Sequence, residues 1–222
     1  MKFNLLCIWI YKLFQFLLEC HKFIRWADRN YPDWGEENDN GEWEFGCGSH
    51  FDQMYEAAMN IISDVDSKDA DEKLINALLF VIARDNESEN LADELIEHKE
   101  WFDLLAVKSA GSKYINAQWQ FAKRLDKCDS SENLIYEFIE SNDEYTSRMA
   151  LQTMAEIDAE KAEEYAVKFW NRGKYPFGSY EDEYQKIMAL HVLNTVGSDM
   201  LAEYLSKAKS MPYKWLRENA EE

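Results

Sequence analysis

The residues with the clearest chemical potential are two pairs of cysteine and histidine near the N-terminus, Cys20 with His21 and Cys47 with His50. Thiolate and imidazole ligands in a tetrahedral arrangement are typical of zinc sites. Adjacent residues of a helix do not share a face, so Cys20 and His21 would point in different directions. Buried thiols and surface histidines explain the same residues. We therefore predict neither a metal nor any other cofactor.

Other patterns that would indicate catalysis are also missing from the sequence. The acidic run between residues 64 and 72 lacks the central glycine and terminal glutamate of a calcium-binding EF-hand. No phosphate-binding loop, dinucleotide fingerprint, nucleophile elbow or zinc-protease helix is present. Carboxylates are so frequent that no single pair identifies an acid–base site. We expect a protein that is not an enzyme.

The chain of 222 residues is strongly acidic, with 24 Lys and Arg against 43 Asp and Glu and a formal net charge of −19. Such a surface repels nucleic acids and anionic membranes. Proteins that bind either of them depend on basic side chains. The charge predicts no direct binding to nucleic acid or membrane, and it favours a basic protein partner. High solubility is the simpler explanation of the same charge.

Acidic and aromatic side chains concentrate in residues 29–50, which also contain half of the glycines. Aromatic rings supply rigid contact area at interfaces, and carboxylates steer basic partners. Two interpretations remain open: the segment binds a partner, or its rings fold inward and close the N-terminal end of the helical stack. On the first interpretation, the partner-binding residues are Asp33, Trp34, Glu36, Glu37, Asp39, Glu42, Trp43 and Glu44.

A second mixture of aromatic and acidic residues interrupts the helical pattern at residues 173–183. Insertions between the helices of repeat proteins lie on one face, and this is often the binding face. We therefore add four residues to the predicted partner surface, namely Tyr180, Glu181, Asp182 and Glu183.

The elements that must position these residues are all helical. An amphipathic pattern predicts a first helix over residues 4–28, which we interpret as a core helix and not as a signal peptide or membrane span. From residue 51 onward, apolar residues recur at helical spacing. The predicted helices are 51–64, 70–85, 89–98, 100–110, 113–126, 132–141, 144–157, 159–171, 180–196, 199–208 and 212–219. With only 8 Gly and 3 Pro, the chain lacks the tight turns of an all-β fold.

Helix pairs recur weakly along the chain, as in residues 145–151 and 184–190. The recurrence predicts an all-α fold of stacked antiparallel helix pairs, an α-solenoid, in which neighbouring pairs bury each other's apolar faces. An irregular helical bundle fits the same periodicity. We expect a single domain over residues 1–222, with an N-terminal helix (1–28), a long acidic aromatic loop (29–50) and helical pairs (51–222).

The four cysteines form no CxxC pair and are spread along the chain. This usage is unlike that of a disulfide-rich secreted scaffold, so we predict a reducing, cytoplasmic location.

Paired helices such as 132–141 and 144–157, the acidic charge and the missing catalytic motifs together resemble a HEAT-like immunity protein. Such proteins belong to bacterial toxin–immunity systems, including contact-dependent growth inhibition. The resemblance covers about residues 70–220 and is one of pattern, not of any specific motif. It implies a cytosolic antitoxin that binds one cognate toxin domain and covers its active site.

The acidic charge would then oppose a basic nuclease toxin, either an RNase or a DNase, because nuclease active sites attract phosphates. Two other classes stay open. One is a HEAT-like scaffold or adaptor without a toxin partner. The other is an enzyme similar to the helical-repeat DNA glycosylases, which the scattered Lys and Arg residues disfavour because such an enzyme needs a basic groove.

Overall fold

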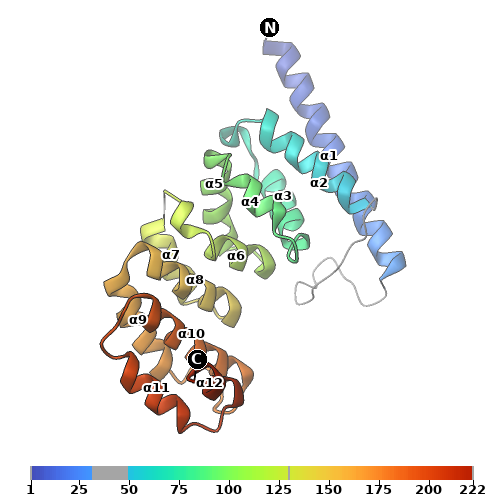
Figure 1. Ribbon diagram of the computed structural model, residues 1–222. Helices are drawn as coiled ribbons and strands as arrows, with labels where there is room; N and C mark the ends of the chain where they lie inside the picture. The colour runs from blue at the N-terminus through green and yellow to red at the C-terminus, as the bar shows by residue number, and fades with distance from the viewer. Residues whose placement is uncertain (1, 32–49, 130, 222) are drawn as a thin grey trace. The chain divides into compact units, whose positions relative to one another are not determined.

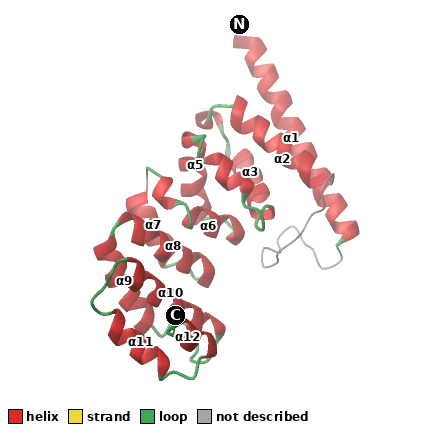
Figure 2. Ribbon diagram, in the orientation of Figure 1, coloured by secondary structure: helices red, strands yellow, loops and turns green. Residues whose placement is uncertain are grey.

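The computed structural model describes residues 2–31, 50–129 and 131–221. Within these ranges every regular element is a helix and none is a strand (Figures 1 and 2). This confirms the all-α fold class, whereas the α-solenoid stays a prediction. The α-helices are α1 (Lys2–Asn30), α2 (His50–Asp64), α3 (Glu72–Arg84), α4 (Asn90–Leu95), α5 (Lys99–Ala110), α6 (Ile115–Ala122), α7 (Ser131–Ile139), α8 (Glu144–Ile157), α9 (Ala159–Asn171), α10 (Tyr180–Thr195), α11 (Leu201–Lys209) and α12 (Lys214–Asn219), and the short 3₁₀ helices are η1 (Ser67–Asp69) and η2 (Leu125–Lys127).

Capping side chains fix where several helices begin. The carboxylates of Asp71, Asp143 and Asp158 accept hydrogen bonds from the first turns of α3, α8 and α9, at 2.8, 2.7 and 3.1 Å. Each bond satisfies a backbone N–H that has no partner within its own helix. Helices α8 and α9 begin and end at the residues that the apolar periodicity predicted.

The helices form two compact units. Unit 1 comprises residues 1–121 and 127–130, and unit 2 comprises residues 122–126 and 131–222. Each unit has its own set of buried apolar side chains, such as Leu78 and Phe102 in unit 1 and Phe138 and Phe169 in unit 2. The expectation of a single domain over the whole chain stays a prediction.

In unit 1, α1 and α2 lie side by side and run antiparallel (Figure 1). Lys12 in the first half of α1 forms an ion pair with Asp64 at the end of α2. At the other end of the pair, the rings of Phe23 and Phe51 meet edge to face at 6.0 Å between centroids. Phe16, Cys20, Phe23 and Ala27 form a buried stripe of α1, at the three- and four-residue spacing of a helix face.

Helix α3 is the centre of the unit 1 core, and most of its side chains are buried. Phe80 packs edge to face against Phe23 of α1 and Tyr114, which directly precedes α6. A hydrogen bond also joins α6 to α3: Gln120 of α6 donates through Nε2 to the carbonyl of Ile82 at 2.8 Å. A buried amide paired in this way fixes the position of α6 relative to α3.

Polar contacts at the helix ends show that α8, α9 and α10 of unit 2 also alternate in direction. Arg172 Nη2, directly after α9, donates to Ser147 Oγ in the first turn of α8 at 3.1 Å. Ser198, beyond the end of α10, donates to Glu163 near the start of α9. Helix α10 contacts both α8 and α9, and α11 and α12 pack against α10.

Within the described ranges, no helix has both the length and the apolarity that crossing a bilayer requires.

The buried indole of Trp101 gives a test of the unit 1 core. Its Nε1 donates to the carbonyl of Val65 at 2.9 Å, joining α5 to the end of α2. Trp101→Phe removes the donor and leaves the carbonyl without it, so we expect a loss of about 1–3 kcal/mol in the free energy of unfolding. Trp215→Phe, at a residue with 37% of its surface exposed, is the control and should change stability by about 0.5 kcal/mol or less. Equal urea midpoints for the two variants would contradict this role of Trp101.

Candidate functional site

The cysteine and histidine residues near the N-terminus do not come together as a described metal site. Cys20 is buried in the α1 stripe, and this burial raises the pKa of its thiol to about 12. His21 directly follows Cys20 on the helix, so it points in another direction and is exposed. Cys47 lies outside the described residues. Among the described residues, no three His, Cys, Asp or Glu side chains are placed as they would be around a metal ion.

The acidic aromatic segment falls mostly outside the described residues. Tyr31 and His50, which flank residues 32–49, both contact the indole of Trp26, at 5.5 and 6.0 Å between ring centroids. The segment therefore begins and ends beside the last turns of α1. The predicted partner-binding residues that lie outside the described residues, and stay predictions, are Asp33, Trp34, Glu36, Glu37, Asp39, Glu42, Trp43 and Glu44.

The four predicted partner residues 180–183 form the first turn of α10, and two of them are exposed while two are buried. Tyr180 keeps 66% of its surface exposed, and Glu181 is also exposed. Asp182 and Glu183 retain only 3% and 6%, because the helix turns these two positions toward the interior of unit 2. The expectation that all four residues face a partner is therefore corrected: only Tyr180 and Glu181 are on the surface.

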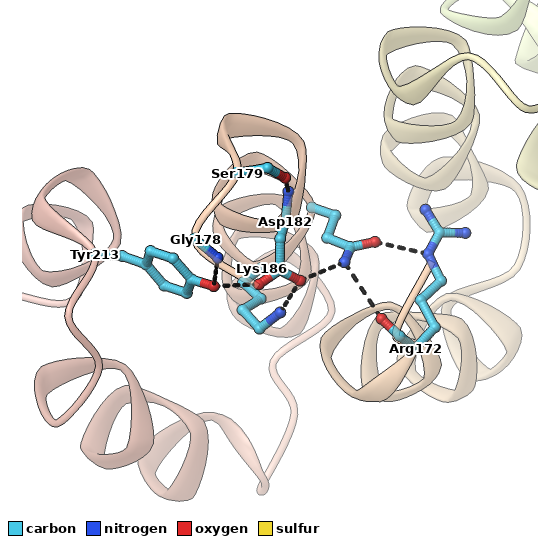
Figure 3. A network of polar contacts seen from close by, with 7 residues as sticks. Arg172, Gly178, Ser179, Asp182, Lys186 and Tyr213 are labelled. Atoms are coloured by element: carbon cyan, nitrogen blue, oxygen red, sulfur yellow. Dashed lines mark hydrogen bonds and ion pairs between the residues drawn. The ribbon is translucent and has the colours of Figure 1, made fainter. Parts of the chain in front are cut away.

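The Asp182 carboxylate is the centre of a buried network (Figure 3). It accepts hydrogen bonds from the ammonium of Lys186, the hydroxyl of Tyr213 and Nε2 of Gln185, the last at 2.9 Å. Burial alone would raise the pKa of Asp182, but these three donors outweigh it and hold the pKa below its usual value. The network extends to Arg172, whose Nε donates to Gln185 Oε1 at 2.8 Å.

This network positions α12 against the start of α10. The Tyr213 hydroxyl accepts a hydrogen bond from the backbone N–H of Gly178 at 3.0 Å while it donates to Asp182 (Figure 3). Glu183 accepts the backbone N–H of Leu216, in the first turn of α12, at 2.9 Å. Asp182 and Glu183 thus hold the chain's own residues in place. The i,i+4 spacing of Asp182 and Lys186 is the one sequence signal that could have indicated this role.

A concave surface of unit 1, which we name the acidic hollow, was missed by the sequence reasoning. It has a volume of about 780 Å³ and lies between α2 and the segment from the end of α3 to the end of α4. Six of its residues are carboxylic acids and two are aromatic, and none of these described lining residues is basic. The lining residues are Phe51, Asp52, Tyr55, Glu56, Asp85, Ser88, Asn90, Asp93, Glu94 and Glu97.

Local structure explains how one wall of the acidic hollow is built. Asp85 directly follows α3, and its Oδ2 accepts the backbone N–H of Leu91 at 2.7 Å. It acts as the cap of α4, because Glu89 at the usual capping position makes no side-chain capping bond. Glu89 has a φ of 55°, and among the described residues no other non-glycine residue has a positive φ. The turn between Asp85 and α4 is therefore strained, at the rim of the hollow.

The electrostatics of the acidic hollow differ from those around Asp182. Asp85 is 4% exposed, and burial raises its pKa to about 6. Hydrogen bonds from the backbone of Leu91 and Asn90 oppose the shift but do not cancel it, and the charges of Glu89 and Asp93 add to it. Burial and the nearby carboxylates likewise raise the pKa of Tyr55 to about 12. The site holds excess negative charge, so a positive group placed there would be stabilised.

A sequence signal for the hollow does exist. Phe51, Asp52, Tyr55 and Glu56 are spaced i, i+1, i+4 and i+5, which places them on one side of a helix. The opposite wall of the hollow could not be found in this way. Asp85, Asp93 and their neighbours come close to α2 only because of the turn before α4.

No family model, no curated protein and no solved structure matches the chain. Its function must therefore be inferred from its own residues.

Proposed function

We propose that the chain is an immunity protein that binds and neutralises a basic nuclease toxin domain, without catalytic activity of its own. The observation that carries the proposal is the acidic hollow, a concave surface lined by six carboxylic acids and two aromatic residues. A concave acidic surface receives a protruding basic one, and the net charge of −19 acts in the same direction at longer range.

Electrostatics support a nuclease as the partner. A nuclease must attract phosphates, so its active site presents positive charge. Carboxylates can occupy such a site in place of the phosphates, and binding there blocks the substrate. Opposite fields also raise the rate of encounter, which an antitoxin needs because it must bind before the toxin acts.

The environment of Asp85 adds a favourable contribution that exists only in the complex. In the free protein, burial and nearby carboxylates make the ionised form of Asp85 costly. A Lys or Arg side chain entering the acidic hollow would relieve this cost by pairing with the carboxylates. Phe51 and Tyr55 supply ring surface for the aliphatic part of the same side chain.

A scaffold or adaptor without a toxin partner would use the same surface, so inhibition separates the two functions. The test co-expresses the full chain with the C-terminal domain of the secreted protein that we expect the neighbouring gene to encode. An immunity protein forms a stable complex with that domain and abolishes its nuclease activity. A neighbouring domain that neither binds the chain nor loses nuclease activity would contradict the proposal.

Neutralising the acidic hollow should slow association with the toxin domain. We expect the triple variant Glu56→Gln, Asp93→Asn, Glu94→Gln to lower the association rate by about tenfold at low salt and to weaken its salt dependence, because exposed charges act mainly on encounter. Stopped-flow measurements over a range of salt concentrations test this.

The matched control changes the net charge by the same amount in unit 2. Glu137→Gln, Glu156→Gln, Glu160→Gln alters three exposed carboxylates far from α2 and α4 in the sequence. It should change the association rate much less than the hollow variant does. Equal effects of the two triple variants would show that overall charge, and not the acidic hollow, steers the partner.

Complex formation should also depend on pH through Asp85, whose pKa is about 6 in the free protein. A cationic partner binds the ionised form better, so the affinity is fully present above about pH 6. It falls as the pH is lowered through this value, by at most about tenfold per pH unit for one linked proton. Calorimetric titrations at several pH values measure the slope. Asp85→Asn should flatten it, whereas an unchanged slope in this variant would assign the pH dependence to another group.

A further inference from the structure

The surface of unit 2 carries a continuous set of stacked side chains, which we name the aromatic row: Tyr145 and Arg148 of α8, Tyr180 and Tyr184 of α10, and Trp215 of α12. The rings of Tyr184 and Trp215 lie 5.9 Å apart between centroids and are inclined by only 12°. Tyr180 stacks on Tyr184 at 6.4 Å between centroids and lies tilted by 33° beside Trp215 at 5.6 Å. Helices α10 and α12 therefore bring three rings together at one place, and Arg148 joins Tyr145 of α8 to them.

The row is exposed although its rings are large. Tyr180, Tyr145 and Trp215 keep 66%, 38% and 37% of their surfaces exposed. Tyr, Trp and Arg are the residues most enriched among those that dominate binding energies at protein interfaces. Their exposure on a folded unit thus fits an interaction surface better than a core.

The chain itself shows which group these rings accept. The guanidinium of Arg148 lies over the ring of Tyr145 at 4.8 Å and over that of Tyr184 at 5.1 Å. Glu144 balances its charge, with 2.9 Å between Arg148 Nε and the carboxylate. A guanidinium between two rings is favoured by the ring quadrupoles and by the planar shape of the group. Beyond Arg148, the row continues with the exposed rings of Tyr180 and Trp215.

The row is held in place before any partner arrives. Trp215 belongs to α12, which the buried carboxylates of Asp182 and Glu183 fix to α10 through Tyr213 and the backbone of Leu216. The rings need little further ordering on binding, and this preorganisation lowers the cost of association. It also explains why two acidic residues directly beside the exposed Tyr180 and Glu181 are buried.

We propose that the aromatic row is a docking site for an arginine side chain of a basic partner protein, stacked on Tyr180 and Trp215 as Arg148 is stacked on Tyr184. The inference rests on the proposed function only in that a basic partner supplies the arginine. The exposed Glu181 and the negative net charge favour a cation at this surface. Arginine fits better than lysine, because its planar group stacks on rings and is more weakly hydrated.

The test compares two capped tripeptides of equal charge, Gly-Arg-Gly and Gly-Lys-Gly, with a citrulline peptide that keeps the planar shape without the charge. Each is titrated into the full chain while the indole N–H resonance of Trp215, assigned with Trp215→Phe, is followed by NMR. Attraction to the overall charge is the same for the first two peptides. We expect the arginine peptide to bind about twofold or more tightly than the lysine peptide, and the citrulline peptide not to bind.

Two variants decide whether the row causes this preference. Tyr180→Ala removes an exposed ring, and we expect this variant to bind the arginine and lysine peptides equally. Tyr136→Ala removes a tyrosine of α7 that is 36% exposed, packs on Tyr165 and is not a member of the row, and it should keep the preference.

Equal affinities for arginine and lysine, or a preference that survives Tyr180→Ala, would overturn the proposal. So would a shift of the Trp215 resonance with protein concentration alone, which would show that a second copy of the chain occupies the row. These outcomes leave the acidic hollow unaffected. Conversely, a toxin domain that does not bind the chain would contradict the proposed function. The preference of the row for arginine would persist in that case.

Discussion

A carboxylate can be buried only where donors or cations replace the water that it loses. With 43 acidic residues, this constraint acts throughout the chain, and two buried aspartates meet it in opposite ways. Asp182 has three side-chain donors, including the ammonium of Lys186, and its pKa is lowered. Asp85 has backbone donors and carboxylate neighbours, and its pKa rises to about 6.

The difference assigns a different role to each aspartate. The network around Asp182 is complete within unit 2, so it stabilises the arrangement of α10 and α12 and requires nothing from outside. Asp85 caps α4 at the acidic hollow, where the charge is still in excess. Under the proposed function, a basic partner would supply the positive charge that Asp85 lacks, which is why we place the partner at this surface. The acidic hollow and the aromatic row are described on separate units, and each stands on its own contacts.

The sequence predicted the all-helical fold because the signals of helices are local, although some predicted helices, such as 113–126, extend beyond the observed ones. Apolar spacing depends only on neighbouring positions, and it located α8 and α9 to the residue. Which acidic residues face a partner is not local information. Tyr180 and Asp182 are two positions apart in one mixed aromatic and acidic segment, and only the packing of α12 on α10 decides that one is exposed and the other buried. The acidic hollow was missed for the same reason, because its two walls come from segments separated by α3.

The state of the Asp85 carboxyl tests the central claim most directly. Carbon-detected NMR of the side-chain carboxyl carbon reports its protonation in the free chain and in the complex with the toxin domain. We expect a titration midpoint near pH 6 in the free chain and a clearly lower midpoint in the saturated complex, because a cation in the acidic hollow favours the ionised form. A midpoint that does not move on saturation would show that the partner does not place positive charge there, and would contradict this account.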